Sequence, residues 1–557
     1  MKATEVIKQL FHEKNIKKVF SLMSDGTKKL VSKLDEDEEI EVVEARHEQN
    51  AMAMADGYAR GTSEIGVCIV GRGPAIAQTG TSLVTSSKNG TKLLVLVPES
   101  PLSTAYDSKG FRQEAFLETM GNDVVSIRSG EVLITKLVQT IRKLERGDGP
   151  IAVQIPWDLM HTEIEIDDQW DPGTHFDGSI QTGARLQPSD EAVTEAVDLY
   201  LDSDKSVPPV IVAGQGAYRS GAEEAIEGLA ERTSAMLATT LQGRGLFADH
   251  PFSIGFVGGF GSNLANDYFK QSDYVLAIGC SLNPHTTDHG RFLEETTIAH
   301  VDINPTHLER HQAVDIGIQG DARETARAIE QELASVGVDF SNKFWTDKQR
   351  SRIAESSALD EREYPEQSDR VDPRELIREL DMMLPTDRLV VVDGGHFTNF
   401  VLDGMSVSSP QDFIWSLDFS SIGQGVPMGI GAATSADDKA CITFCGDSGF
   451  MMTLQELNTI AREQIPVTLI VMNDQALGSE FHQLDLADKN AAAAQCETPD
   501  FEKIAQDFGV EGHTVQSLAD LESLRDKLSE KPEEPRLVDC KINRQVRHRF
   551  YLDLHGF

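Results

Sequence analysis

The sequence predicts an α/β protein made of three doubly wound parallel-sheet domains. Two observations support this fold class. Short apolar runs rich in β-branched residues alternate with amphipathic helical patterns along the whole 557-residue chain, as expected for parallel sheets covered by helices. The chain is also too long for one ordinary hydrophobic core, so two to four domains are expected.

The first predicted domain covers residues 1–165 and is the N-terminal one. Its strand candidates are short apolar runs separated by helical patterns, namely IGVCIV (Ile65–Val70), KLLVLVP (Lys92–Pro98) and PIAVQIP (Pro150–Pro156). Runs of this length and composition are typical of buried strands. A polar, Gly/Asp-rich stretch, Ile166–Asp190, follows and is predicted to be a linker.

The second predicted domain covers residues 190–335. It repeats the same alternation, with strand candidates in PPVIVAGQGA (Pro208–Ala217), YVLAIGC (Tyr274–Cys280) and TIAHVDINP (Thr297–Pro305). A charged stretch, Thr346–Pro373, separates it from the third domain. No fixed-period repeat is visible, so the three domains are not copies of one short unit.

The third predicted domain covers residues 373–557 and contains a strand–helix–strand pattern. The apolar runs ACITFC (Ala440–Cys445) and VTLIVM (Val467–Met472) flank MMTLQELNTIARE, in which Met451 and three later apolar residues recur at helical spacing. A tight turn is expected at 446–449 and an amphipathic helix after it. Two buried strands around one helix predict a parallel βαβ unit.

Each of these two strands is followed by an acid, Asp447 after the first and Asp474 after the second. The carboxyl ends of neighbouring parallel strands are where open α/β sheets bind ligands. Carboxylate oxygens suit a hard cation such as Mg²⁺, and N–H groups at a helix start suit a phosphate. The alternative is that Asp447 only caps the helix, and the spacing alone does not decide between the two.

A second motif lies near the N-terminus, in EARHEQNAMAMADGYAR (Glu44–Arg60). Its alanine and methionine positions predict a well-packed helix with Glu48 at its start. On local grounds alone, Glu48 is more simply a solvated or helix-capping acid.

Taken together, these motifs resemble the thiamine diphosphate enzymes of the acetohydroxyacid synthase, pyruvate oxidase and pyruvate decarboxylase group. The family's metal motif is similar to Gly446-Asp447-Ser448 followed by Asn473-Asp474. The resemblance implies that Asp447, Asp474 and the carbonyl of Ala476 bind Mg²⁺. It also implies that Glu48, with GYAR (Gly57–Arg60) ending its helix, activates the cofactor.

Two further stretches match the family. SIGQGVPMGIGAA (Ser421–Ala433) resembles the segment under the thiazolium ring, and DGGHF (Asp393–Phe397) resembles the loop on the diphosphate. The residues predicted to bind the cofactor are Gly395, His396, Ile422, Gly446, Ser448 and Gly449. Ile422 corresponds to the large apolar residue that bends the cofactor.

The chain also departs from the family pattern. Asp474 replaces Asn and Ser448 replaces Gly in the metal motif, and GRGPAIAQ (Gly71–Gln78) differs from the usual segment near the aminopyrimidine. Glu480 lies six residues after Asp474, where decarboxylases of the group carry an active-site glutamate. It is therefore a catalytic candidate, and the alternative is a solvated acid on a helix. His482 is predicted to be a surface or packing residue.

The amino-acid composition limits the kinds of partner that the protein can bind. Ninety acidic against 51 basic residues give a formal net charge of −39, which argues against nucleic acid and anionic membranes. No apolar run reaches membrane-spanning length. The six cysteines lie mostly in apolar runs without metal-ligand spacing, which favours free thiols in a reducing compartment and a cytoplasmic protein. The resemblance implies a homodimer or homotetramer with shared active sites.

The predicted function is therefore a thiamine diphosphate- and Mg²⁺-dependent lyase or transferase that cleaves or forms C–C bonds next to a carbonyl. A buried Glu48 would have a raised pKa and share a proton with the cofactor. The alternatives are an FAD-containing acetohydroxyacid synthase, a 2-hydroxyacyl-CoA lyase and a non-catalytic paralogue. FAD in the middle domain is possible, and the substrate is not defined by the sequence.

Overall fold

The structure is a computed structural model that describes residues 1–147, 149–164, 170–176, 185–356, 362–436 and 438–553. The residues group into two compact units. One combines 1–180, 364–398 and 414–546, and the other combines 181–363, 399–413 and 547–557. The predicted domain boundaries at 165, 190, 335 and 373 stay predictions, and each predicted linker contains residues outside the described ranges.

The fold class is confirmed: three six-stranded sheets run through the described residues, and every strand pairing given between their strands is parallel. The N-terminal sheet has the order β2-β1-β3-β4-β6-β5. Its strands are β1 (Lys18–Ser21), β2 (Glu41–Glu44), β3 (Gly66–Ile69), β4 (Leu93–Glu99), β5 (Asp123–Ser126) and β6 (Ile151–Pro156). The predicted strands in this domain are β3, β4 and β6.

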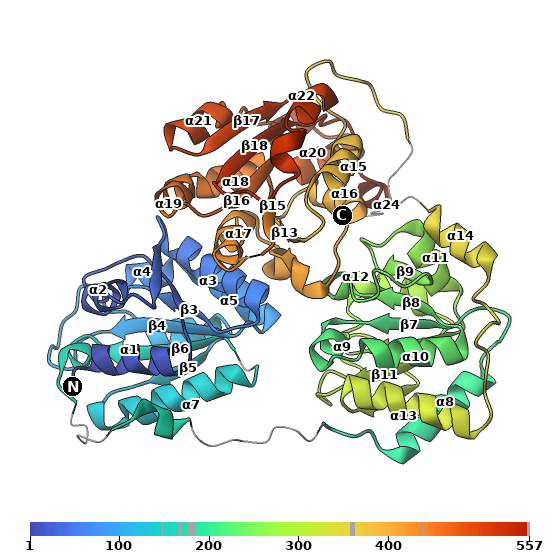
Figure 1. Cartoon of the computed structure of the whole chain (residues 1–557), viewed down its shortest axis with the longest axis horizontal. Helices are drawn as coiled ribbons and strands as arrows, with labels where there is room; N and C mark the ends of the chain where they lie inside the picture. Colours follow the sequence, from blue (N-terminus) through green and yellow to red (C-terminus); the bar gives the residue numbers. More distant parts are fainter. Residues whose placement is uncertain (148, 165–169, 177–184, 357–361, 437, 554–557) are drawn as a thin grey trace. The chain divides into compact units, whose positions relative to one another are not determined.

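Helices cover both faces of the N-terminal sheet (Figure 1). They are α1 (Ala3–Glu13), α2 (Lys28–Asp35), α3 (Glu48–Thr62), α4 (Pro74–Ala77), α5 (Gly80–Asn89), α6 (Gln113–Thr119) and α7 (Leu133–Glu145). The strongly amphipathic α7 buries Leu137, Ile141 and Leu144 against one face. The opposite face carries α3, whose residues from Asn50 to Ala59 are all buried.

The middle sheet has the order β12-β11-β10-β7-β8-β9. Its strands are β7 (Val210–Ala213), β8 (Met236–Thr239), β9 (Ser253–Phe256), β10 (Tyr274–Ile278), β11 (Thr297–Asp302) and β12 (Ile316–Gln319). Its helices are α8 (Asp190–Asp202), α9 (Gln215–Ser220), α10 (Glu223–Thr233), α11 (Asn263–Gln271), α12 (Pro284–Thr287), α13 (Ala322–Ser335) and α14 (Asp347–Ala354). The three predicted strands are β7, β10 and β11.

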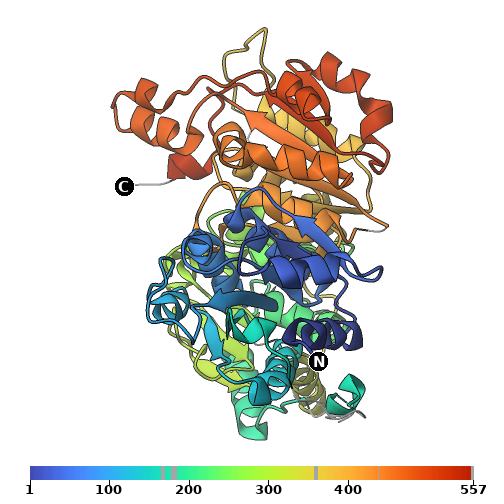
Figure 2. The same cartoon turned by 90° about the vertical axis from the view of Figure 1, so that its left-hand side faces the viewer.

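The C-terminal sheet has the order β14-β13-β15-β16-β18-β17. Its strands are β13 (Arg388–Val392), β14 (Phe413–Trp415), β15 (Ala440–Gly446), β16 (Val467–Asn473), β17 (Glu511–Val515) and β18 (Arg536–Lys541). Figure 2 shows the helices of this domain, orange to red, around the sheet. The predicted βαβ unit is confirmed, because β15 and β16 are adjacent and parallel.

The helices of this last third of the chain are mostly short. They are α15 (Pro373–Met383), α16 (Thr398–Gly404), α17 (Gly425–Ala433), α18 (Asp447–Thr453), α19 (Leu457–Arg462), α20 (Gly478–Leu486), α21 (Phe501–Asp507), α22 (Leu518–Ser523), α23 (Arg525–Leu528) and α24 (Phe550–Asp553). The predicted single helix between β15 and β16 is wrong in detail. It consists of α18, a 3₁₀ turn at Leu454–Glu456, and α19.

The predicted tight turn at 446–449 is also wrong, because α18 begins at Asp447 directly after β15. Met451, placed on the apolar face by its spacing, is 47% exposed. The 3₁₀ turn interrupts the α-helical spacing, and Leu457 and Ile460 after it are buried while Met451 before it is not. Helical spacing identifies apolar positions but not where a helix breaks.

Helices α3 and α17 cross at very close range within the first unit (Figure 1). A Cβ added to Gly57 would lie 2.0 Å from the carbonyl oxygen of Met428, and one added to Gly431 would lie 1.8 Å from that of Met54. Only glycine permits two backbones to approach so closely. The crossing therefore fixes α3, and Glu48 at its start, against the C-terminal domain of the same chain.

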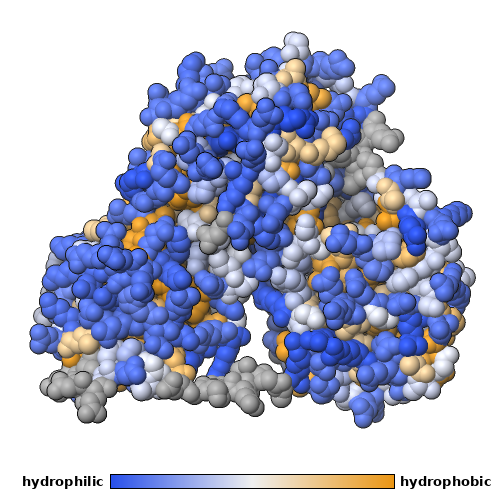
Figure 3. All heavy atoms as spheres, viewed as in Figure 1, coloured by the Kyte–Doolittle hydropathy of each residue, from blue (hydrophilic) through white to orange (hydrophobic). Residues whose placement is uncertain are grey.

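The surface is largely polar. Hydrophilic residues cover most of the face shown in Figure 3, in keeping with acids dispersed along the sequence. No helix among the described residues is long and apolar enough to cross a membrane. Five cysteines are buried as free thiols, as predicted from their apolar surroundings, whereas Cys496 is exposed.

Candidate active site

The two predicted metal ligands lie at the ends of adjacent strands. Gly446 at the end of β15 pairs with Met472 near the end of β16, so Asp447 and Asp474 emerge side by side, and both are buried. The helix-capping alternative fails for Asp447, because the N-cap of α18 is Gly446 and Asp447 is already the first helical residue. Sheet register alone thus brings the two acids together.

The acid pair has an electrostatic cost in the absence of a cation. Burial raises the pKa of both carboxyl groups, and the charge of Asp447 raises the pKa of Asp474 further, against the opposing effect of Arg544 and Arg370. Asp447 Oδ1 accepts a hydrogen bond from the N–H of Ser448 (2.7 Å). Asp474 Oδ1 accepts one from the N–H of Ala476 (3.0 Å).

These features fit a hard cation. The buried Oδ2 of Asp447 accepts no hydrogen bond within the described residues, and a buried carboxylate oxygen without a donor is costly unless a metal or proton satisfies it. No group of three or more His, Cys, Asp or Glu side chains suited to a metal occurs in the described part of the chain. The predicted set of two carboxylates and the Ala476 carbonyl would leave the remaining positions to water and a diphosphate, as Mg²⁺ prefers.

The predicted diphosphate loop lies beside the acid pair. Gly395 has φ +145°, a conformation that favours glycine, and a Cβ there would lie 2.9 Å from the ring of Phe397. A Cβ on Gly446 would lie 3.2 Å from the same ring. Phe397 therefore packs between the loop after β13 and the end of β15, and it holds these two predicted cofactor-binding glycines close together.

A buried acid, Asp393, organises the segment that carries Ile422. Its Oδ2 accepts a hydrogen bond from the N–H of Gly423 (2.8 Å), and its Oδ1 accepts one from the hydroxyl of Ser416 (3.1 Å). A Cβ on Gly449 would lie 2.7 Å from Asp393 Oδ2, so α18 approaches the same carboxylate. Burial raises the pKa of Asp393, and the backbone hydrogen bonds act in the opposite direction.

Ile422 itself is only partly buried. A Cβ on Gly394 would lie 3.1 Å from Ile422 Cγ2, so the side chain rests over the loop after β13. This position, next to Gly395 and away from the sheet core, agrees with a side chain that supports a bound molecule.

His396 lies near Asp474, with Gly478 between them. Its ring packs on that of His482 with centroids 4.1 Å apart, and both side chains are buried. A Cβ on Gly478 would lie 2.6 Å from Asp474 Oδ2 and 3.0 Å from His396 Cβ. Of the two predictions for His482, a surface residue is wrong and a packing residue is confirmed, and its packing partner is a predicted cofactor-binding residue.

Ser448 is partly exposed. Its hydroxyl lies 3.6 Å from the thiol of Cys496, the one exposed cysteine. Cys496 is held there because its N–H donates to the carbonyl of Gln475 (3.0 Å). Nothing in the sequence pattern indicated that Cys496 is next to Ser448.

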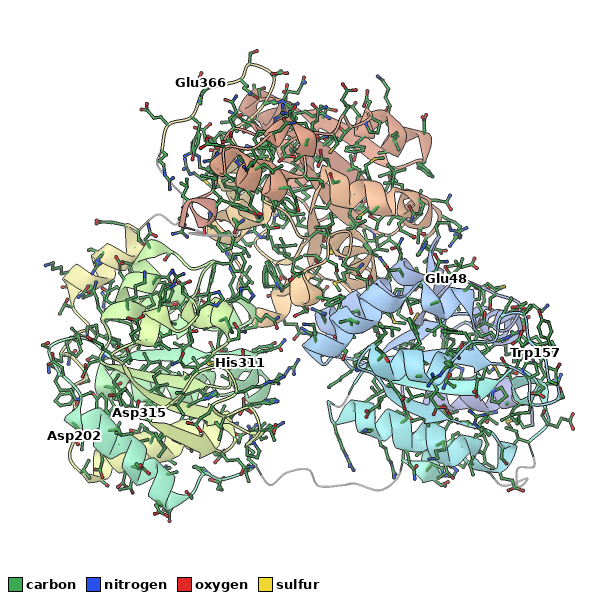
Figure 4. All side chains as sticks on the ribbon, turned by 180° about the vertical axis from the view of Figure 1, so that it is seen from behind. Glu48, Trp157, Asp202, His311, Asp315 and Glu366 are labelled. Carbon is green, nitrogen blue, oxygen red and sulfur yellow. The ribbon has the colours of Figure 1, made fainter. Side chains whose placement is uncertain are left out.

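Glu48 is the first residue of α3 and belongs to the N-terminal domain (Figure 4). It is not the helix cap, since His47 is the N-cap and its Nδ1 accepts the N–H of Gln49 (3.1 Å). Gln78 donates a hydrogen bond to Glu48 Oε2 (3.3 Å), and its Oε1 lies 3.0 Å from His47 Nε2. The capping alternative is therefore wrong for Glu48.

The structure does not bring every predicted residue into one cluster. Glu48 is partly exposed, so one chain does not supply the low-dielectric surroundings predicted for it. Among the described hydrogen bonds, Glu48 shares no partner with Asp447 or Asp474. Glu480 is exposed on the first turn of α20.

Sequence reasoning missed Asp393 and Glu456 as possible members of the site. Asp393 carries the signal that identified Asp447, an acid directly after an apolar strand. Glu456 carried no such signal, because it lies within an amphipathic pattern where an acid is expected to face solvent.

Family models match all three parts of the chain in order. Residues 1–123 match the thiamine pyrophosphate enzyme N-terminal TPP-binding domain, 196–329 the central domain, and 393–540 the C-terminal TPP-binding domain. Thiamine pyrophosphate is the same compound as thiamine diphosphate.

Named relatives are similar over almost their whole length. The chain is 28% identical to a probable acetolactate synthase large subunit of Methanocaldococcus jannaschii, over 98% of this chain and 92% of the relative. It is 25% identical to the acetolactate synthase isozyme 3 large subunit of Escherichia coli, over 96% and 93%. It is 28% identical to a sulfoacetaldehyde acetyltransferase of Alcaligenes xylosoxydans, over 86% and 83%.

Proposed function

Because the chain belongs to the thiamine pyrophosphate enzyme family, we propose that it is a thiamine diphosphate- and Mg²⁺-dependent enzyme that cleaves or forms C–C bonds next to a carbonyl. The observation that carries the proposal is the buried pair Asp447 and Asp474 at adjacent strand ends, inside a segment that matches a C-terminal TPP-binding domain. Family membership supports the cofactor, and the acid pair supports the metal.

The roles proposed for this chain's residues follow from their positions. Asp447, Asp474 and the Ala476 carbonyl hold the cation, and the loops at Gly395 and Gly446 receive the diphosphate. Bound thiamine diphosphate supplies a carbon nucleophile and an electron sink. Glu48 holds a proton shared with a ring nitrogen of the aminopyrimidine, which makes that ring a base.

We further propose that each active site is shared by two copies of the chain, in a homodimer or homotetramer. Large apolar side chains are exposed after the carboxyl ends of strands in both the N-terminal and the C-terminal sheet: Met23, Tyr106, Phe419, Met452 and Leu477. Exposed apolar residues gathered at such edges are typical of protein interfaces. A second copy on these edges would also enclose Glu48, which one chain leaves partly exposed.

Glu480 is proposed to act on the substrate, because it is exposed on the helix that begins four residues after Asp474. The relatives' names concern two different reactions, acetolactate synthesis and sulfoacetaldehyde acetyl transfer. The substrate is therefore proposed only as a class, a 2-oxo acid or a 2-hydroxy carbonyl compound, with an acetolactate synthase-like reaction first.

A substrate panel tests the proposal. The protein is loaded with thiamine diphosphate and Mg²⁺ and given pyruvate, other 2-oxo acids, sulfoacetaldehyde with phosphate, and 2-hydroxyacyl-CoA compounds. Turnover of pyruvate to acetolactate supports the leading reaction, and a flavin spectrum in the purified protein supports the FAD-containing alternative. Cofactor binding without turnover of any compound would favour the non-catalytic alternative.

A further inference from the structure

A buried glutamate in the C-terminal domain makes its hydrogen bonds at the start of the helix that carries Glu48. Glu456 ends the 3₁₀ turn after α18 and is 0% exposed. A buried carboxylate is costly unless several donors satisfy it. The donors around Glu456 therefore show what this residue holds in place.

These donors come mainly from the N-terminal domain. The N–H of Arg46 lies 3.0 and 3.2 Å from the two oxygens of Glu456, and Asn50 Nδ2 lies 2.8 Å from Oε1. Thr459 of the same domain as Glu456 adds a hydroxyl at 2.6 Å. Arg46 and Asn50 are two residues before and two residues after Glu48. The carboxylate of Glu456 therefore accepts hydrogen bonds from both sides of Glu48.

The rest of α3 is fixed by other contacts. Gly57 packs against the backbone of Met428, and Arg60 forms a buried ion pair with Asp418 of the C-terminal domain (2.6 Å). The helix would therefore stay docked without Glu456. Glu456 acts on the first turn, where the side chain of Glu48 leaves the backbone and where the hydroxyl of Ser82 also donates to the carbonyl of Gln49 (3.0 Å).

We propose that Glu456 is a positioning residue, which aims Glu48 by fixing Arg46 and Asn50 and does not itself touch the cofactor. The inference rests on the activating role proposed for Glu48. It also connects the two halves of the chain, since Glu456 lies nine residues after Asp447. The segment from Asp447, a proposed metal ligand, to Glu456 thus contacts the start of α3, which carries the proposed activator Glu48.

The test compares substitutions of two buried carboxylates, one that binds the start of α3 and one that lies further along the same helix. Glu456→Gln keeps one acceptor oxygen, which can accept from Asn50 or from Thr459 but not from both, and in either orientation its NH₂ group faces the N–H of Arg46. Asp56→Asn is the matched control, because Asp56 is equally buried on α3, two turns beyond Glu48, and is bonded to Arg60 and Thr91. Glu456→Asp keeps the charge and serves if Glu456→Gln does not fold.

Two measurements are made on the full-length protein. In cofactor-free protein, backbone hydrogen exchange in residues 46–51 should become at least about tenfold faster in Glu456→Gln and stay unchanged there in Asp56→Asn. In protein loaded with thiamine diphosphate and Mg²⁺, C2–H exchange of the bound cofactor should slow by about 10²-fold, since a misplacement of about 1 Å has effects of that size. Cofactor affinity should change by less than about threefold.

A double variant separates positioning from a purely structural role. If Glu456 acts through Glu48, adding Glu456→Gln to Glu48→Gln should slow C2–H exchange no further, whereas independent effects would multiply. Multiplying effects, or an unchanged exchange rate in folded Glu456→Gln, would overturn the inference. If Glu48→Gln itself leaves the exchange rate unchanged, the proposed role of Glu48 has failed instead.

Discussion

The acid pair and Glu48 differ in how completely one chain builds their surroundings. Asp447 and Asp474 are buried, in register at the ends of β15 and β16, and each accepts a backbone hydrogen bond. Glu48 is partly exposed, and its side chain accepts a hydrogen bond of 3.3 Å from Gln78. One chain therefore preforms the diphosphate side of the proposed site, whereas the activating side is the one that the proposed second copy would complete.

The largest effect is expected for a substitution of Glu48, in the less complete region. Glu48→Gln keeps the shape of the side chain but cannot share a proton in the same way. We expect C2–H exchange of bound thiamine diphosphate to slow by about 10²–10⁴-fold, with a much smaller change in cofactor affinity. Deuterium exchange followed by NMR measures the first, and calorimetry measures the second.

The control is Glu38→Gln, an exposed carboxyl group in the same domain. It should leave both quantities unchanged. A solvated, non-catalytic Glu48 would make the two variants behave alike, and that result would contradict the proposed role.

The next largest effect is expected when the proposed Mg²⁺ is removed from the preformed region. Without a cation, a diphosphate would face at least one ionised buried carboxylate, even where the raised pKa of Asp474 lets that acid keep a proton. At an effective dielectric constant of about 20, like unit charges about 4 Å apart repel by about 4 kcal/mol. We therefore expect EDTA to weaken thiamine diphosphate binding by about 10²-fold or more in calorimetry, and excess Mg²⁺ to restore it.

Asp447→Asn should weaken the response to Mg²⁺, while the surface change Asp507→Asn should not. Equal affinity with EDTA and with Mg²⁺ would contradict the metal assignment for Asp447 and Asp474.

A mixing experiment asks whether the two regions meet across two chains. Inactive Glu48→Gln and inactive Asp447→Asn proteins are mixed after dissociation and reassociated. In a shared-site dimer, half of the molecules are mixed and each contains one intact site, so about a quarter of full activity should return. If both regions served the site of their own chain, no activity would return.

The sequence predicted the preformed region better than the other, for a physical reason. Asp447 and Asp474 follow two apolar runs that had to be neighbouring strands, and sheet register then fixed their proximity. Glu456 could not be found this way, because its contacts with Arg46 and Asn50 join segments about 410 residues apart. Local periodicity carries no information about such a contact.

Helix α18 illustrates the same limit. The spacing of Met451 predicted a buried side chain, and the residue is 47% exposed. The pattern correctly marked this stretch as apolar, but it did not show that a 3₁₀ turn interrupts the helix after Thr453. Met452, the next residue, is also exposed and is among the side chains that the proposed second copy would cover.

The smallest effect concerns the substitution of Asp for Asn at 474. Burial and the charge of Asp447 raise the pKa of Asp474 above its usual value of 3.8. The folded protein therefore keeps a proton that the unfolded chain has lost, and its stability falls as pH rises above about 4. Asp474→Asn removes this ionisation and leaves the family's usual ligand in place.

We expect cofactor-free Asp474→Asn to unfold at a higher temperature than the unchanged protein at pH 7.5, by about 2–4 °C for each kcal/mol gained. The difference should shrink as the pH is lowered toward 4, because the unfolded chain then begins to bind the proton that the folded protein keeps. Mg²⁺ should also reduce it, since the cation neutralises the pair that the substitution relieves. Asp507→Asn removes one exposed charge and should give almost no shift at any pH. A difference that persists at pH 4, or that Asp507→Asn reproduces, would mean that the net charge of −39, and not the buried pair, sets the stability of the preformed region.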